Sequence, residues 1–175
     1  MNTISEKYLS EQKRLHEMDN YGTASISHAP FIIQILKEKN LISICDYGAG
    51  KMNLKKTIDE KGYENYEYFP YDPVFPEYGP PKKADLICCI DVMEHVEEEY
   101  VDNVLDEIQN ITLKFVYLTI ATKPANKKLS DGRNAHITLK PDGTRLYESW
   151  EWYVITCGCS RLPSARDIFL KINEK

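Results

Sequence analysis

Short apolar runs alternate with amphipathic segments along the first two thirds of the chain. Four runs have the length and the apolar or aromatic character of buried strands, over residues 41–45, 66–71, 84–90 and 114–120. Apolar positions spaced by three and four residues predict three helices, over residues 30–40, around 54–58 and over 101–111. Strands that alternate with helices in this way predict a parallel sheet with helices on its faces.

The segments outside these elements are less regular. Residues 73–83 contain four prolines, a density at which neither a helix nor a strand persists. Beyond residue 120 we expect a basic loop over 121–145 with a short strand at 136–139, a helix over 146–157 that carries Trp150 and Trp152, and a last strand at 166–173. No internal repeat or linker is visible, which predicts a single domain over residues 1–175, with residues 1–28 as a polar N-terminal arm.

The composition is that of a globular protein in water, with 42% apolar and 28% charged residues. No apolar stretch reaches the ~20 residues that span a bilayer. The first thirty residues are polar and mixed in charge, unlike a signal peptide. We therefore expect a cytoplasmic protein that does not enter a membrane.

The cysteines point to free thiols. There are five, an odd number without the spacing of a small disulfide scaffold, and this favours a reducing compartment. Cys157 and Cys159 are separated by a single residue and have no second ligand pair, so they do not match a zinc site. We expect no bound metal.

Charge is unevenly distributed along the chain. The net charge of −5 disfavours a broad nucleic-acid contact. Residues 122–146 nevertheless carry six cations and two anions, whereas residues 91–107 are strongly acidic. A solvated face explains each run; a basic loop above a ligand site is the alternative, and it would favour a small anionic partner. The oligomeric state does not follow from the sequence.

Three aspartates stand where predicted strands end, at Asp46, Asp72 and Asp91. Right-handed crossovers place the carboxyl ends of parallel strands on one edge of the sheet. Sheets of this kind bind ligands in the crevice at that edge. The three carboxylates are therefore expected to converge on a ligand.

The turn after the first strand discriminates between ligands. Gly48 and Gly50 let the backbone approach a ligand without a Cβ in the way. A dinucleotide fingerprint would need a third glycine where Asn53 stands. Asp46 would oppose a pyrophosphate and attract a cation. A neutral or cationic nucleoside fits this turn better than NAD.

Three motifs carry a resemblance to a known family. The run from Asp46 to Lys51, Asp-Tyr-Gly-Ala-Gly-Lys, resembles the glycine-rich signature of class I S-adenosylmethionine-dependent methyltransferases. Asp72 matches the acidic residue that binds the ribose hydroxyls in that family. Residues 91–96, Asp-Val-Met-Glu-His-Val, resemble the loop beside the methionine moiety in small-molecule methyltransferases. The resemblance covers residues 20–120.

The resemblance implies a Rossmann-like three-layer sandwich with S-adenosyl-L-methionine as the cofactor. It assigns cofactor contacts to Asp46, Gly48, Gly50, Asp72, Pro73, Asp91, Val92 and Met93. In this family a segment before the first strand often closes over the cofactor, which makes Tyr21 a candidate contact; an ordered arm without that role is the alternative. The family also places a helix and a third strand after the ribose acid. Residues 73–83 are too short for both, so we expect that part of the sheet to be missing or shortened.

Candidates for the acceptor side follow two of the strands. His95 and His136 are the possible general bases, and Asn134 and Arg133 lie beside His136 in the basic loop. Arg133 could bind a phosphate or carboxylate of the acceptor. The alternative for His95 is a residue at a helix start that packs on the ligand loop, and for His136 an inert loop position.

The expected function is methyl transfer to a small, anionic or phosphate-bearing acceptor. The Asn/Asp-Pro-Pro-Tyr/Phe box of enzymes that methylate the amino groups of DNA bases is absent, because residues 91–94 read Asp-Val-Met-Glu. Cleavage of the cofactor, or its binding without methyl transfer, remains an alternative. An NAD-dependent oxidoreductase is disfavoured by Asn53 and Asp46.

Overall fold

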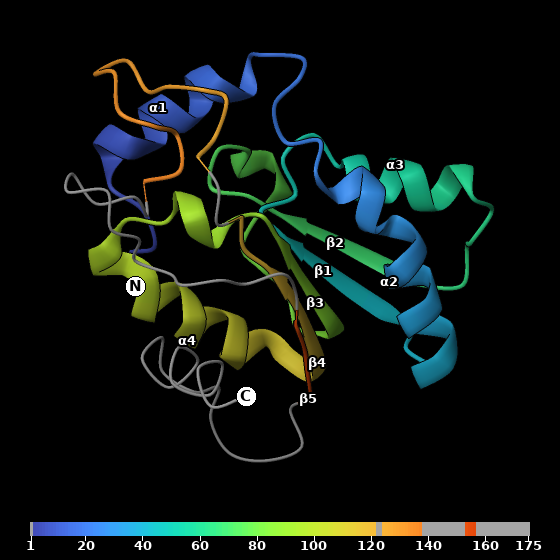
Figure 1. Ribbon diagram of the computed structural model, residues 1–175. Helices are drawn as coiled ribbons and strands as arrows, with labels where there is room; N and C mark the ends of the chain where they lie inside the picture. The colour runs from blue at the N-terminus through green and yellow to red at the C-terminus, as the bar shows by residue number, and fades with distance from the viewer. Residues whose placement is uncertain (1, 122–123, 138–152, 157–175) are drawn as a thin grey trace, which may run out of the picture.

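The described part of the chain folds around a five-stranded sheet. The computed structural model describes residues 2–121, 124–137 and 153–156. Within these residues the strand order is β2-β1-β3-β4-β5 (Figure 1). The strands are β1 (Ser43–Tyr47), β2 (Glu67–Tyr71), β3 (Ala84–Ile90), β4 (Thr112–Thr119) and β5 (Tyr153–Thr156). Strands β1 to β4 are parallel and β5 is antiparallel to β4, which confirms the mostly parallel sheet.

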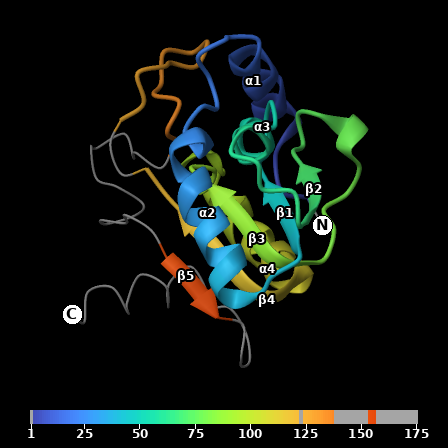
Figure 2. The same cartoon turned by 90° about the vertical axis from the view of Figure 1, so that its right-hand side faces the viewer.

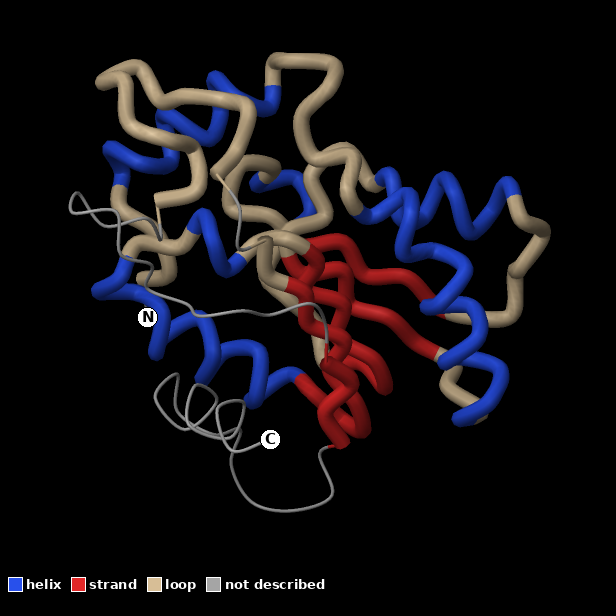
Figure 3. Tube along the Cα trace, viewed as in Figure 1, coloured by secondary structure: helices blue, strands red, loops and turns tan. Residues whose placement is uncertain are grey.

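Helices cover both faces of the sheet. α2 (Ser25–Lys39) and α3 (Asn53–Glu60) lie on one face, and α4 (Val101–Ile111) lies on the other (Figure 2). The strands form the middle layer between them (Figure 3), so the predicted Rossmann-like three-layer arrangement is confirmed. α1 (Glu6–His16) lies beyond the carboxyl ends of the strands. Single turns of 3-10 helix are η1 (Pro76–Tyr78), η2 (Met93–His95) and η3 (Glu98–Tyr100).

Among the described residues, two apolar layers of the core pack on the sheet, one on each face. All residues of β1 and β3 are buried, as expected of strands covered on both faces. The layer under α2 and α3 includes Ile32, Leu36, Leu54, Ile58, Ile44 and Leu86. The layer under α4 takes the alternate strand positions and includes Cys45, Ile87, Cys89, Val104, Leu105 and Ile108. Each large aliphatic side chain buried in this way stabilises the fold by about 1.5–3 kcal/mol.

The connection between β2 and β3 contains no third strand. Residues 72–83, all of which are described, hold only η1, so the predicted shortening is confirmed, and among the described strands β2 is an edge of the sheet. The backbone N–H of Glu67 donates to the carbonyl of Ile42 at 2.8 Å. Because donors alternate between the two sides of a strand, the nitrogen of Pro70 faces away from β1. A proline is tolerated there because no bond of the sheet needs its missing N–H.

The N-terminal part of the chain is more helical than the sequence pattern predicts. The polar arm forms α1, whose buried residues Tyr8, Gln12 and Leu15 are spaced by four and three positions. α2 begins at Ser25, so Pro30 lies inside the helix and not at its first turn. The proline removes one helical hydrogen bond. Full burial of its neighbour Ala29 and of other residues of the helix outweighs that loss.

The region after β4 also differs from prediction. Tyr153–Thr156 form β5, so the predicted helix over 146–157 is wrong in its described part. These four residues have high β propensity, and pairing with β4 satisfies their backbone groups. The described residues 136–137 are not in a strand. Trp150, Trp152 and the predicted strand at 166–173 lie outside the described residues.

No described helix is long and apolar enough to cross a membrane. Cys45, Cys88 and Cys89 are buried free thiols, as predicted. Cys157 and Cys159 lie outside the described residues.

Candidate functional site

A cavity of about 550 Å³ lies at the carboxyl edge of the sheet. Asp46 at the end of β1, Asp72 directly after β2 and Asp91 directly after β3 all line it. The carboxyl ends of parallel strands meet at one edge, so the three aspartates converge as predicted. Asp91 has a backbone φ of 53°, a left-handed conformation that is strained for a residue other than glycine.

The glycine turn after β1 interlocks with the loop after β3. Gly48 has a φ of +85°, and a Cβ built there would lie 2.3 Å from Cγ2 of Val92. The N–H groups of Gly48 and Ala49 both donate to the carbonyl of Tyr71, at 2.8 and 2.9 Å. The turn therefore packs too closely for any side chain at position 48, and it is bonded to the end of β2.

Two backbone N–H groups hold the side chain of Asp72 in place, one at each carboxylate oxygen. Oδ2 accepts a hydrogen bond from the N–H of Gly50 at 2.9 Å, and Oδ1 accepts one from the N–H of Val74 at 2.8 Å. Burial raises the pKa of Asp72, while these two bonds and nearby His16 oppose the rise. Each carboxylate oxygen keeps a further lone pair for a ligand donor.

Asp46 is buried beneath the turn and accepts a hydrogen bond from the hydroxyl of Tyr68. Burial raises the pKa of Asp46 to about 7, although the Tyr68 hydrogen bond lowers it and the charge of Asp72 adds to it. The carboxyl is therefore poised to lose its proton close to neutral pH. Sequence reasoning missed Tyr68, because its place beside Asp46 depends on the pairing of β1 with β2.

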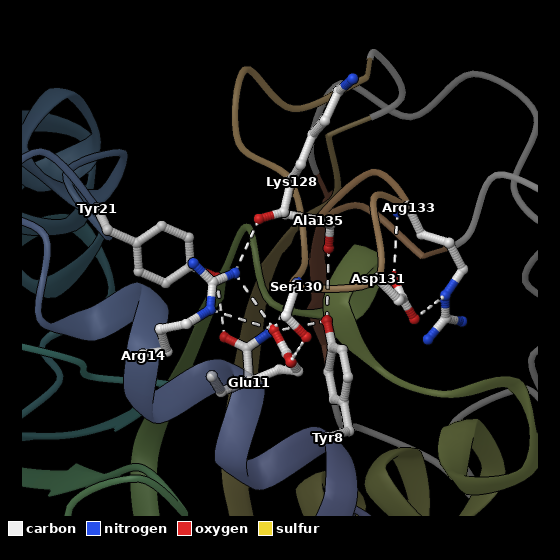
Figure 4. Close-up of polar contacts among 10 residues, drawn as sticks. Tyr8, Glu11, Arg14, Tyr21, Lys128, Ser130, Asp131, Arg133 and Ala135 are labelled. Carbon is white, nitrogen blue, oxygen red and sulfur yellow. Dashed lines mark hydrogen bonds and ion pairs between the residues drawn. The ribbon is translucent and has the colours of Figure 1, made fainter.

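The roof of the cavity joins α1 to the loop over residues 124–137. Arg14 donates to the carbonyl of Lys128 at 2.9 Å, and the N–H and hydroxyl of Ser130 both donate to the carboxylate of Glu11 (Figure 4). The hydroxyl of Tyr8 donates to the carbonyl of Ala135 at 3.4 Å. These contacts connect segments more than a hundred residues apart, so no local sequence pattern could have predicted them.

A chain of hydrogen-bonded side chains runs from α1 into the cavity. Gln12 donates to the hydroxyl of Tyr8 at 2.7 Å and accepts from the hydroxyl of Tyr21 at 2.8 Å. The ring of His16 meets Tyr21 and Phe75 edge-on, with centroids 4.9 and 5.3 Å away. All but Phe75 line the cavity. Tyr21 was predicted; Tyr8, Gln12 and His16 were missed because the arm was not expected to form a helix.

Another part of the cavity wall consists of Glu94 and His95 from η2 and of His136 from the loop over residues 124–137. Nδ1 of His95 lies 2.8 Å from the carbonyl of Ala135, and because a carbonyl only accepts, Nδ1 carries the proton. The rings of His95 and His136 meet edge-on with centroids 4.9 Å apart. Burial and the neighbouring His136 lower the pKa of His95 to about 3. Burial raises the pKa of Glu94 to about 8, with the charge of Asp91 adding to it.

Ten of the predicted site residues line the cavity: Asp46, Gly48, Gly50, Asp72, Pro73, Asp91, Val92, Tyr21, His95 and His136. Three others lie elsewhere, which corrects their expected positions. Met93 is buried in the layer under α4. Asn134 bonds within its own loop, to both backbone groups of Ala125 and to the N–H of His136. Arg133 is exposed and pairs with Asp131 at 2.8 Å (Figure 4).

The arrangement divides the cavity into two chemically different parts. Aspartates, a glycine turn and aromatic rings occupy the part next to β1 and β2. A carboxyl group and two imidazoles occupy the part next to the loop over residues 124–137. Lys127 also lines the cavity and donates to Asn20 at 2.7 Å, so a cation stands at its rim.

Comparison with known proteins finds similarity at the level of the backbone. No protein-family model and no curated protein matches the sequence. The structure described as "DhpI-SAM-HEP complex" has a TM-score of 0.47 and 12% identity, over 98% of this chain and 90% of that one. The Burkholderia thailandensis 1,6-didemethyltoxoflavin-N1-methyltransferase, with its substrate and S-adenosylhomocysteine bound, has a TM-score of 0.48 and 11% identity, over 77% of this chain and 73% of that one.

A third similar structure is magnesium protoporphyrin IX methyltransferase from Synechocystis PCC 6803 with bound SAH. It has a TM-score of 0.40 and 15% identity, over 67% of this chain and 68% of that one. All three similarities are weak, and the chemistry of the cavity carries the functional argument.

Proposed function

We propose that this protein is a class I S-adenosylmethionine-dependent methyltransferase that acts on a small, anionic or phosphate-bearing acceptor. The observation that carries the proposal is the fixed carboxylate of Asp72, held beside a glycine turn at the carboxyl edge of the sheet.

The cofactor half suits an adenosine that carries a cation. Asp72 offers both carboxylate oxygens to adjacent ribose hydroxyls, and its backbone bonds fix their direction. His16 lies over Gly50, with its Cε1 3.1 Å from where a Cβ would be. Its Nδ1 is buried and has no hydrogen-bond partner among the described residues, so a nucleoside donor or acceptor would satisfy it. Phe75, edge-on to His16, provides an apolar ring nearby.

The ionised carboxylate of Asp46 is opposite in charge to the sulfonium and ammonium groups of the methionine moiety. The carboxylate would oppose a pyrophosphate, whereas a sulfonium or an ammonium group stabilises its ionised form. Gly48 lets the turn above Asp46 pack directly against Val92, which keeps the turn at the wall of the cavity. Together these features favour S-adenosylmethionine over a dinucleotide.

The reaction needs mainly alignment of the two reactants. A lone pair of the acceptor forms a bond to the methyl carbon, the carbon–sulfur bond breaks, and its electron pair stays on sulfur. The positive sulfonium becomes a neutral thioether, and a protonated acceptor loses its proton to a base or to water. Holding the donor and acceptor in line supplies much of the acceleration. Lys127 at the cavity rim favours an acceptor with negative charge.

Two measurements test this proposal. Calorimetric titration of the protein should show tighter binding of S-adenosylmethionine than of NAD, and equal binding of NAD would refute the cofactor assignment. Incubation with S-adenosylmethionine and a panel of phosphorylated and carboxylated small molecules should give S-adenosylhomocysteine, detected by mass spectrometry. Formation of methylthioadenosine would instead identify cofactor cleavage, and tight binding without any product would identify a binding protein.

A further inference from the structure

Three potential metal ligands converge in the acceptor half of the cavity. A carboxylate oxygen of Glu94 and one nitrogen from each of His95 and His136 all lie within 4.8 Å of one another. Glu94 and His95 belong to η2, and His136 belongs to the loop over residues 124–137. Tertiary folding therefore brings the set together, and all three residues line the cavity.

One carboxylate oxygen of Glu94 lacks the partner that a buried polar atom normally has. Glu94 is completely buried, and its Oε1 accepts a hydrogen bond from the N–H of Ala121 at 3.0 Å. Its Oε2 has no hydrogen-bond partner in the part of the chain that the structure describes. Most buried polar atoms are paired, and leaving one unpaired costs about 1–3 kcal/mol. A cation at the wall of the cavity would satisfy this oxygen.

The ring of His95 is oriented as that of a metal ligand is, and the backbone of His136 is fixed. Nδ1 of His95 donates to the carbonyl of Ala135, so Nε2 keeps its lone pair. Metal-binding histidines almost always donate their second N–H to a carbonyl or carboxylate, which fixes the ring and its tautomer. The side chain of Asn134 accepts from the N–H of His136 at 2.9 Å and so fixes the backbone that carries the second imidazole.

We propose that Glu94, His95 and His136 bind one divalent transition-metal ion and leave further positions open to a ligand. Two imidazoles with one carboxylate suit Zn²⁺, Co²⁺ or Mn²⁺, whereas Ca²⁺ and Mg²⁺ take oxygen ligands. Bond lengths of about 2.0–2.2 Å bring the ligand atoms closer together than 4.8 Å, through side-chain rotation around the ion. No metal was expected from the sequence, because His136 lies far along the chain from Glu94 and His95.

The role of the ion rests on the proposed function. An acceptor hydroxyl or phosphate oxygen would occupy an open position opposite the methyl donor. A bound hydroxyl loses its proton to water more readily, because the ion stabilises the resulting oxyanion. His95 and His136 would then be metal ligands and not general bases.

Metal titration of the whole chain tests the site without any methyl-transfer assay. Protein treated with a chelator and dialysed should bind one Co²⁺ per chain by calorimetry, with the visible absorption bands of Co²⁺ bound to nitrogen. Zn²⁺ should displace it. Glu94→Gln and His136→Ala should each weaken binding at least about tenfold, since even residues that only support ligands cost 10–100-fold. His28→Ala, which removes a histidine outside the cavity wall, should bind as the unchanged protein does.

Glu94→Gln keeps an oxygen for the N–H of Ala121, so the fold should survive, and circular dichroism melting checks this. The inference is overturned if the unchanged protein binds no Co²⁺, or if folded Glu94→Gln and His136→Ala bind it as tightly. Titration with S-adenosylmethionine is run on the same samples. Metal binding without cofactor binding would refute the proposed function alone, and cofactor binding without metal binding would refute this inference alone.

Discussion

Asp46 gives the proposed cofactor site a pH dependence that can be measured. Burial raises the pKa of Asp46 to about 7, so below neutral pH the carboxyl is mostly protonated in the protein without cofactor. S-adenosylmethionine carries a sulfonium, and a cation binds the ionised carboxylate better than the neutral acid. Cofactor affinity should therefore increase as the pH rises to about 7 and level off above it.

The magnitude follows from proton linkage. If only the ionised form binds, affinity falls up to tenfold, or about 1.4 kcal/mol, for each pH unit below the pKa of Asp46. A decrease of about two pH units would thus weaken binding by up to about 100-fold. Calorimetric titration with S-adenosylmethionine across this range, between about pH 5 and about pH 9, measures the profile directly.

Three variants separate Asp46 from other titrating groups. Asp46→Asn should flatten the rise, because the amide does not titrate. Tyr68→Phe removes the hydrogen bond that lowers the pKa of Asp46, so the rise should move to higher pH. Tyr66→Phe, a matched change at a tyrosine bonded to exposed Asp59, should leave the profile unchanged. The raised pKa of Asp72 adds its own dependence, and an unaltered profile in Asp46→Asn would refute the reasoning.

Three further outcomes are expected. Asp72→Ala should weaken cofactor binding by ~1.5–3 kcal/mol, the scale of hydrogen bonds to a charged group, and unchanged calorimetric affinity would remove it from the ribose role. Gly48→Ala puts a methyl carbon 2.3 Å from a methyl group of Val92, so it should lower the free energy of unfolding by ~1–3 kcal/mol. It should also weaken cofactor binding. Gly132→Ala, at φ +86° with nothing within 4 Å, should show backbone strain alone in the same denaturant titration. Glu11→Ala removes the carboxylate that binds Ser130, so a protease should cleave the loop over residues 124–137 faster. Glu6→Ala should leave the cleavage rate unchanged. Equal rates in the two variants would show that Glu11 does not hold this loop.

The parts of the site that depend on strand ends could be predicted from the sequence. Asp46, Asp72 and Asp91 end apolar runs, and parallel strands bring such ends to one edge. The missing third strand could also be predicted, because residues 73–83 are too short and too rich in proline. These inferences need only local pattern and the handedness of crossovers.

The parts that depend on long-range contacts could not be predicted. α1 reaches the cavity because Tyr8 and Glu11 bond to a loop more than a hundred residues away. Arg133 was expected at the acceptor, but its near neighbour Asp131 pairs with it away from the cavity. Charge counted along a chain does not tell which way an exposed side chain faces.

The missing strand also has a consequence for pairing between strands of different copies of this protein. An unpaired edge strand is a template for strands from other chains. On β2 that edge lacks a donor at Pro70, and Glu67 is exposed with its negative charge. Lys82 lies 5.1 Å from the centroid of the Phe69 ring and so places a cation over the same strand. A shortened sheet of this kind keeps its ligand crevice while its open side remains a poor partner for intermolecular β-pairing.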